Sequence, residues 1–212
     1  MSAEKLYDIG QHRVRHGSVM DGLNSLFAGS PKAALFYSDP PWGQGNIKYW
    51  QTLNARMNPG AAKQEIDYPA FLMKIMELAV HFTTGPVFIE YGVKWKDDVI
   101  AYGARAGLQH VAVATPTYNQ GLPLHLHLFV TPGFPRPAIG PDYLNALGMT
   151  HGLMTVKTAV MPFIRPGEIL LDPCCGLGFS ARAAMAYGMR FYGNELNEAR
   201  LAVTRKHLMM GH

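Results

Sequence analysis

The sequence predicts an α/β protein built on a Rossmann-like, doubly wound sheet. Short, apolar, β-prone runs at 33–37, 87–91 and 110–114 alternate with helical patterns at 68–84 and 95–106. This alternation is typical of a parallel sheet with helices on both faces. The chain has 212 residues, of which 48% are hydrophobic, so it can bury one substantial core. We therefore expect a single domain.

Composition limits the classes of function. The formal net charge is +4, and charged residues make up only 16% of the chain, against about a quarter in typical soluble domains. The basic balance permits a nucleic-acid partner without demanding one. The low charged fraction leaves apolar surface that a cofactor cleft or a homodimer interface would cover.

The cysteines and the hydropathy pattern indicate a compartment. Cys174 and Cys175 are adjacent, which places them poorly for an ordinary disulfide, and this fits a reducing environment. The N-terminus lacks the apolar core of a signal peptide, and no run approaches the length of a membrane span. We expect a cytoplasmic protein without a membrane partner.

The first segments are polar and then helical in pattern. Residues 12–16 form a basic cluster, which is either a solvated surface or a phosphate contact. Residues 17–27 carry apolar side chains at helical spacing, so a short helix is expected to lead into the strand at 33–37.

That strand runs into an acidic, proline-rich turn, Asp39-Pro40-Pro41-Trp42. In an open α/β sheet, ligands bind at the carboxyl ends of strands. An ionised carboxylate can accept one N–H of a planar amine, and the carbonyl of Pro40 can accept the other. Trp42 offers a flat wall for a heterocyclic base. A plain strand-ending turn with a half-buried tryptophan is the alternative.

The segment that follows, residues 43–67, lacks strong periodicity. Long irregular segments beside a catalytic turn are more often functional than passive. Its basic and aromatic residues are therefore candidates for substrate contact: Lys48, Tyr49, Trp50, Arg56 and Lys63.

Helices are expected at 68–84, with Asp67 as N-cap, and at 95–106, ending at Gly107. Residues 115–150 break the alternation. Within them, period-two spacing places His125 and His127 on one face. Because no third ligand has suitable spacing, we interpret these as solvent-facing histidines on an edge strand of a hairpin-like insert, and we predict no metal site.

The last third contains a buried strand at 169–172, a glycine-bearing turn and a helix that stops at Gly188. Gly176, Gly178 and Ala181 match the dinucleotide-binding fingerprint, and Glu195 follows where a ribose-binding acid would lie. NAD is the obvious rival ligand. However, only about one βα unit follows the turn, so earlier strands must complete the sheet, in a circularly permuted order.

These two motifs, in this order, resemble S-adenosylmethionine-dependent amino-methyltransferases of the β class, which modify adenine N6 or cytosine N4 in DNA. The chain is also similar to Asp-Pro-Pro-Trp enzymes that methylate adenine in messenger RNA. The resemblance implies a methyltransferase sheet with a catalytic half at 17–114, a small insert or target-recognition candidate at 115–150 and a cofactor half at 151–212.

The resemblance also implies roles for single residues. Asp39 and Pro40 would hold the amine, followed by Pro41 and the stacking Trp42. Ser180 would bind the methionine carboxylate and Glu195 the ribose hydroxyls, while residues 151–157 loosely match the segment that closes the methionine pocket. The complete set implied for the cofactor is Asp172, Pro173, Cys174, Cys175, Gly176, Gly178, Phe179, Ser180, Glu195, Leu196 and Asn197.

The implied reaction is methylation of adenine N6 in DNA, because Asp ahead of Pro-Pro is the commoner adenine pattern in this family. The short insert implies a short or loose recognition sequence, on a base that is flipped out or already single-stranded. An RNA adenine methyltransferase, a cytosine-N4 DNA methyltransferase and a non-catalytic cofactor-binding subunit remain open. A protein glutamine methyltransferase fits less well, because those enzymes carry the cofactor motif first.

Overall fold

The computed structural model describes residues 4–57, 67–118 and 121–211. These residues form a nine-stranded sheet with the order β1-β2-β9-β8-β3-β4-β7-β5, in which β6 pairs with β7. The strands are β1 (Lys5–Ile9), β2 (His12–His16), β3 (Leu35–Ser38), β4 (Pro86–Gly92), β5 (Gln109–Ala114), β6 (Thr117–Tyr118), β7 (Leu122–Val130), β8 (Ile169–Asp172) and β9 (Arg190–Glu195).

The α/β class is confirmed, but the sheet is mixed. The neighbours from β2 through β9, β8 and β3 to β4 are parallel, whereas β7 runs antiparallel to both β4 and β5. β1 pairs antiparallel with β2 at one edge. The expected run of consecutive parallel strands is therefore interrupted, because β7 inserts between β4 and β5.

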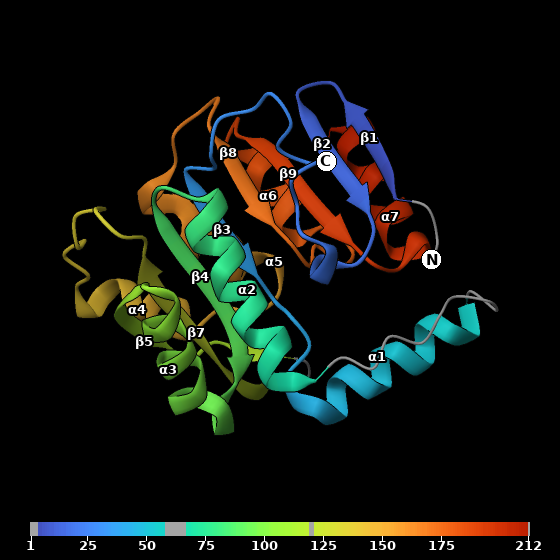
Figure 1. The fold of residues 1–212 in the computed structure, drawn as a ribbon. Helices are drawn as coiled ribbons and strands as arrows, with labels where there is room; N and C mark the ends of the chain where they lie inside the picture. The colour runs from blue at the N-terminus through green and yellow to red at the C-terminus, as the bar shows by residue number, and fades with distance from the viewer. Residues whose placement is uncertain (1–3, 58–66, 119–120, 212) are drawn as a thin grey trace.

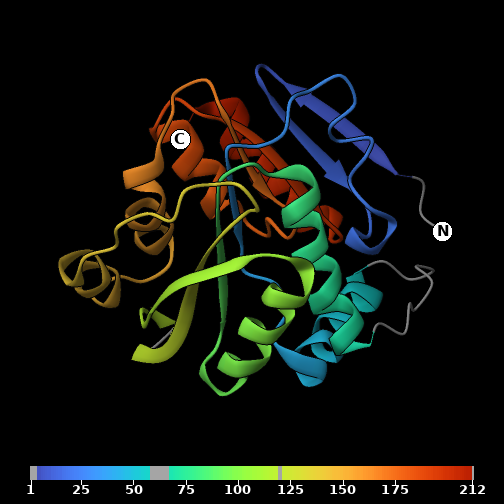
Figure 2. The ribbon, with the colours of Figure 1, turned by 60° about the vertical axis from the view of Figure 1, so that its left-hand side comes forward.

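Helices cover both faces of this sheet (Figures 1 and 2). α2 and α3 pack on one face, while α4, α5, α6 and α7 pack on the other. The α-helices are α1 (Gly43–Met57), α2 (Tyr68–Phe82), α3 (Lys96–Ala106), α4 (Pro141–Gly148), α5 (Leu153–Val160), α6 (Phe179–Ala186) and α7 (Glu198–Met210), with 3₁₀ turns η1 (Val19–Asp21), η2 (Val93–Trp95) and η4 (Met161–Phe163).

Two expected helices are confirmed with their ends. The Asp67 carboxylate accepts a hydrogen bond from the Ala70 amide at 3.4 Å, which caps α2. α3 ends at Gly107, whose φ of +93° is the left-handed conformation that glycine adopts without strain. None of the helices in the described ranges is long and apolar enough to cross a membrane.

The segment at 43–57 was expected to be irregular, but it forms helix α1. Its sequence is rich in glycine, asparagine and glutamine, so little apolar periodicity marks it, although Ile47 is buried against the α2 side of the core. In Figure 1, α1 projects beyond the ends of β3 and β4. Residues 58–66, including Lys63, lie outside the described residues.

Two N-terminal expectations are wrong. Residues 17–27 form only η1 and turns, because Gly22 takes a φ of +85° that ends the 3₁₀ turn; Leu23 and Leu26 are still fully buried. The basic cluster at 12–16 is strand β2, and its Arg15 side chain is only 1% exposed. It is therefore neither a solvated patch nor, at Arg15, an open phosphate contact.

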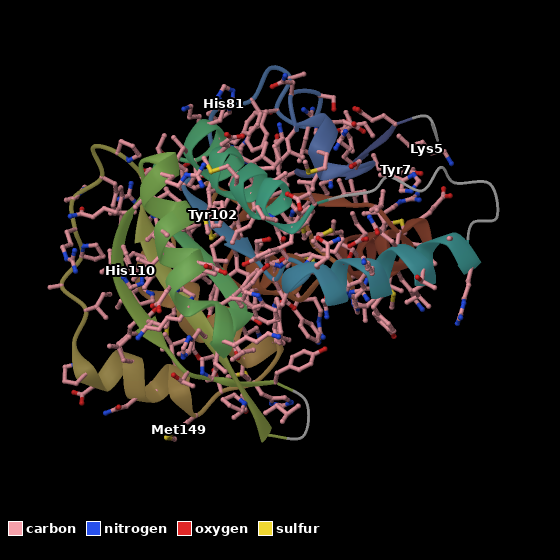
Figure 3. All side chains as sticks on the ribbon, turned by 60° about the horizontal axis from the view of Figure 1, so that its bottom comes forward. Lys5, Tyr7, His81, Tyr102, His110 and Met149 are labelled. Atoms are coloured by element: carbon pink, nitrogen blue, oxygen red, sulfur yellow. The ribbon has the colours of Figure 1, made fainter. Side chains whose placement is uncertain are left out.

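The histidine pair also lies elsewhere than expected. β7 is inside the sheet rather than at its edge, so His127 is fully buried and burial lowers its pKa to about 3. His110, on the neighbouring β5, packs against it with ring centroids 5.7 Å apart. Figure 3 labels His110 among the side chains of the molecule. Within the described part of the chain, no three His, Cys, Asp or Glu side chains could hold a metal ion.

Candidate active site

The carboxyl ends of three neighbouring strands bring the predicted acids to one edge of the sheet. Asp39 follows β3, Asp172 ends β8 and Glu195 ends β9, and these strands are adjacent in the order β9-β8-β3. This edge is where α/β sheets bind ligands. The Asp39-Pro40-Pro41-Trp42 turn and the glycine turn therefore lie side by side, although they are far apart in sequence.

The turn after β3 is held rigidly. The Tyr91 hydroxyl donates to the Pro41 carbonyl at 3.1 Å and accepts from the Gly43 amide at 3.1 Å. Gly43 has a φ of +65°, and a Cβ there would lie 2.3 Å from the Trp95 ring. Only glycine therefore fits where the turn enters α1.

Asp39 is the open acid of the site. Its side chain is exposed, and its Oδ1 atom accepts a hydrogen bond from Trp42 Nε1 at 3.1 Å. Desolvation of the carboxylate by the protein packed around it raises its pKa to about 6, although the Trp42 hydrogen bond and the Arg200 charge both favour the ionised form. Because water reaches the group and this pKa lies below 7, Asp39 is ionised at neutral pH.

Asp172 is a closed acid by comparison. It is 4% exposed, and its two oxygens accept from the Cys174 amide at 2.9 Å and from Ser180 Oγ at 2.5 Å. Burial raises its pKa to about 7 despite these bonds. Asp172 thus ties the glycine turn to the start of α6, and Ser180 points at Asp172.

The glycine turn itself leaves no room for side chains. Gly176 and Gly178 have φ values of +53° and +87°, and Cβ atoms there would lie 2.6 Å from Arg200 and 2.9 Å from Thr204. The Gly176 carbonyl accepts from Thr204 Oγ1 at 3.0 Å. Both glycines are buried, and the absence of side chains lets the turn pack directly against Arg200 and Thr204 of α7.

Glu195 lies across from this turn. Its Oε2 accepts from the Gly176 amide at 2.9 Å and its Oε1 from the Asn197 amide at 2.7 Å. The Leu196 amide is a third donor to this carboxylate, which still has acceptor capacity left for a ligand hydroxyl. Burial raises the pKa of Glu195, while its amide partners and Arg200 oppose that shift.

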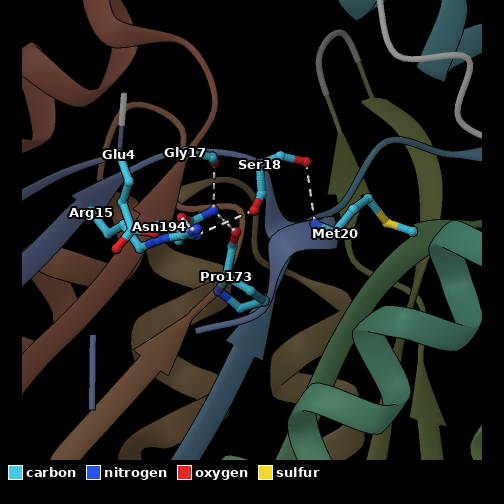
Figure 4. Close-up of polar contacts among 7 residues, drawn as sticks. All are labelled: Glu4, Arg15, Gly17, Ser18, Met20, Pro173 and Asn194. Atoms are coloured by element: carbon cyan, nitrogen blue, oxygen red, sulfur yellow. Dashed lines mark hydrogen bonds and ion pairs between the residues drawn. The ribbon is translucent and has the colours of Figure 1, made fainter. Parts of the chain in front are cut away.

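A buried network supports the glycine turn from the other side (Figure 4). The Arg15 guanidinium donates to Asn194 Oδ1 at 2.6 Å, and Asn194 Nδ2 donates to the carbonyls of Pro173 at 3.0 Å and Gly17 at 3.2 Å. Glu4 pairs with the same guanidinium at 3.1 Å. The charge of Arg15 is thus satisfied inside the fold, where it fixes the Asp172-Pro173 turn.

The two cysteines are packing residues here. Both are free thiols, and burial raises the pKa of each. A thiol kept neutral by burial is a poor nucleophile, so nothing in their surroundings favours covalent catalysis.

The remaining predicted residues fall into two groups. Phe179 and Leu196 are 46% and 42% exposed at the site, whereas Asn197 is buried and caps α7 by accepting from the Arg200 amide at 3.0 Å. On α1, Lys48, Tyr49 and Arg56 are exposed, and Trp50 stacks against the Arg200 guanidinium at 4.4 Å. The structure therefore brings Trp50 against Arg200 of the cofactor half.

Three residues of this edge were missed from the sequence. Arg200 lies near Gly176 and against Trp50, and Tyr118 packs edge-on to Trp42 with centroids 5.4 Å apart. Glu90 is a buried acid in β4. Only Glu90 carried a signal, as a charge inside the apolar run 87–91.

The fold is that of DNA methyltransferases, although the chain matches no protein-family model and no curated protein sequence. It is similar to TTHA0409 of Thermus thermophilus, provisionally assigned as a DNA modification methylase, with a TM-score of 0.66, 16% identity and coverage of 94% and 95% of the two chains. It is also similar to M1.HpyAVI, with a TM-score of 0.63, 13% identity and coverage of 92% of this chain and 97% of that one.

The cytosine-N4-specific PvuII DNA methyltransferase is a third structural neighbour, with a TM-score of 0.64, 9% identity and coverage of 94% and 93%. Structures of TTHA0409 and of M1.HpyAVI complexed with S-adenosylmethionine are also similar to this chain, at TM-scores of 0.62 and 0.63. These neighbours agree on one architecture: a single mixed α/β sheet of the DNA methyltransferase type.

Proposed function

We propose that this protein is an S-adenosylmethionine-dependent methyltransferase that acts on the exocyclic N6 amine of adenine in DNA. The observation that carries the proposal is the placement of an open, ionised acceptor, Asp39, beside a glycine cradle on the adjacent strand. Glu195, on the next strand, completes the cradle.

The residues fit the cofactor. Gly176 and Gly178 let the turn pack tightly against α7 next to Glu195, and Glu195 keeps acceptor capacity for the ribose hydroxyls. Phe179 and Leu196 present exposed apolar side chains suited to an adenine ring. Ser180 already donates to Asp172, so we assign it to the support of the turn, and it reaches the methionine carboxylate only if that bond is exchanged.

S-adenosylmethionine, when bound, supplies a methyl group already activated on a sulfonium. What the chain must supply is position and charge. Asp39 accepts one N–H of the target amine and the Pro40 carbonyl the other, since the neighbouring Pro41 has no amide proton to compete. Trp42 stacks on the base, and the proton released by the product amine passes to Asp39 or to water.

Two observations favour DNA and adenine. Among the structural neighbours, TTHA0409 is provisionally assigned as a DNA modification methylase and the PvuII enzyme is a DNA methyltransferase. Asp39 precedes the two prolines, where serine is the commoner residue in cytosine enzymes. The amine-holding turn precedes the glycine turn in the chain, which supports the permuted, β-class order. The basic net charge of +4 suits a polyanion.

The test is transfer of labelled methyl from S-adenosylmethionine to duplex DNA, single-stranded DNA and RNA in parallel, with identification of the nucleoside by mass. N6-methyldeoxyadenosine is the expected product. N6-methyladenosine would move the substrate to RNA, and N4-methyldeoxycytidine would change the base. Cofactor binding without transfer to any of the three would indicate a binding-only subunit.

A further inference from the structure

Glu90 is a buried acid that the chemistry described so far does not use. It lies in β4, is 7% exposed, and its Oε1 accepts a hydrogen bond from the buried Tyr37 hydroxyl. Among the described residues, no lysine, arginine or histidine forms an ion pair with it. A carboxylate without a cation is costly to bury, so such a group normally keeps its proton.

The sheet register places Glu90 beside Asp39. Ser38 pairs with Ile89 at the end of the parallel β3–β4 ladder, so the next residues on each strand, Asp39 and Glu90, are neighbours on one face. Phe36 pairs with Leu171 on the other side of β3, which puts Asp172 beside Tyr37. Three carboxyl groups therefore surround one tyrosine. Burial raises the pKa of Tyr37, and these acids raise it further.

Asp39 and Glu90 differ in how readily they lose their protons. Burial raises the pKa of Glu90 well above its usual value, and the nearby charges of Asp39 and Asp172 raise it further. The pKa of Asp39 is about 6. Two like charges this close resist ionising together, so at neutral pH the negative charge is on Asp39 and the proton on Glu90. The residue of β7 that pairs with Glu90 is the apolar Leu126.

Of the two neighbouring carboxyl groups, Asp39 has the unused oxygen that could accept the proton of Glu90. Oε1 of Glu90 already takes the Tyr37 hydroxyl, so Oε2 carries the proton. Both Asp172 oxygens accept from Cys174 and Ser180, and Trp42 binds only one oxygen of Asp39. We propose that Glu90 is a positioning residue, which stays protonated and orients the Asp39 carboxylate toward the amine. This role rests on the proposed function.

The first test separates the protonated from the ionised form by substitution. Glu90→Gln keeps a neutral group of the same shape, so kcat at pH 7 should stay within about threefold of wild type. Glu90→Leu removes the hydrogen bond and should lower kcat by about thirtyfold or more, with the dissociation constant of S-adenosylmethionine unchanged. Glu168→Gln, an exposed acid, is the matched control.

The pH profile adds a readout that a purely structural role would not move. Wild type and Glu90→Gln should share the acid limb near pH 6 set by Asp39. Only wild type should also lose activity as the pH rises through the raised pKa of Glu90. Equal inactivity of Glu90→Gln and Glu90→Leu would overturn the proposal, and so would full activity of Glu90→Leu.

A second measurement does not depend on methyl transfer. With glutamate labelled at the side-chain carboxyl carbon, the ¹³C signal that Glu90→Gln removes identifies Glu90. It should report a protonated acid at pH 7, and Asp39→Asn should lower its pKa. An ionised Glu90 at pH 7, or no response to Asp39→Asn, would overturn the role. If wild type transfers no methyl group to any nucleic acid, the proposed function fails, and this signal still decides the state of Glu90.

Discussion

The chain uses the dipeptide Asp-Pro twice, each time after a buried strand, and the two copies are built differently. Asp39-Pro40 ends β3 with an exposed carboxylate that one tryptophan N–H contacts. Asp172-Pro173 ends β8 with a carboxylate that is 4% exposed and bonded at both oxygens. Asp39 therefore has unused acceptor sites for a ligand, whereas both oxygens of Asp172 accept hydrogen bonds from its own turn and from the start of α6.

The difference teaches that surroundings, not the dipeptide, decide the role. Asp172 faces the first amide of its own turn and the hydroxyl of Ser180 at the start of α6. Asp39 is followed by two prolines, which lack amide protons, so the backbone next to it cannot satisfy it in the same way. Pro41 stands where Cys174 stands in the other turn, and because it has no amide proton, the Asp39 carboxylate remains free to accept a hydrogen bond from a ligand.

The largest effect is expected from the open acid. Asp39→Ala should reduce methyl transfer by about a thousandfold, because the amine loses its charged acceptor. Affinity for S-adenosylmethionine in calorimetry should stay within a few-fold. If cofactor affinity fell as much as methyl transfer, Asp39 would belong to the cofactor site, and the assignment of separate roles to the two turns would be wrong.

The closed acid should matter first for folding. Asp172→Ala leaves the Ser180 hydroxyl and the Cys174 amide without their partner, so the free energy of unfolding should fall by about 3 kcal/mol. Chemical denaturation measures this. Asp142→Ala, at an exposed acid in α4, should change it by less than about 0.5 kcal/mol. Equal stability of the two variants would show that Asp172 is not structural.

Glu195 tests whether the cradle beside Asp172 binds the ligand. Glu195→Ala should weaken S-adenosylmethionine binding by about thirtyfold, as two hydrogen bonds to hydroxyls are lost. Glu195→Gln, which keeps one acceptor oxygen, should lose less. Unchanged affinity in both variants, in protein that melts normally, would remove Glu195 from the site.

Arg200 lies between the two turns and should give the smallest effect. Its charge favours the ionised form of Asp39, so Arg200→Ala should raise the pKa of Asp39. The acid limb of the activity profile then moves above pH 6, and activity at pH 6.5 falls about threefold. Arg105→Ala removes a similar cation–π pair, with Tyr102 on α3, and should leave the profile unchanged.

The sequence predicted strands β3, β4, β5 and β8 and the turns that follow β3 and β8, because each signal was local: a short apolar run, ending at β3 and β8 in prolines or glycines. It failed where long-range packing decides. The polar composition of α1 concealed a helix, and the basic residues at 12–16 concealed strand β2, whose arginine finds Asn194 only in the folded sheet. Arg200 and Tyr118 join the site through tertiary contacts that no spacing reveals.

The pairing of β3 with both β4 and β8 also has a consequence for folding. During synthesis β3 meets β4 early, but its other edge has no partner until β8 emerges, on the order of ten seconds later. An unpaired, apolar strand edge is prone to pairing with other chains. The sheet centre is closed by distant segments, which favours slow folding, and nascent chains that stop before residue 169 are expected to need chaperone protection.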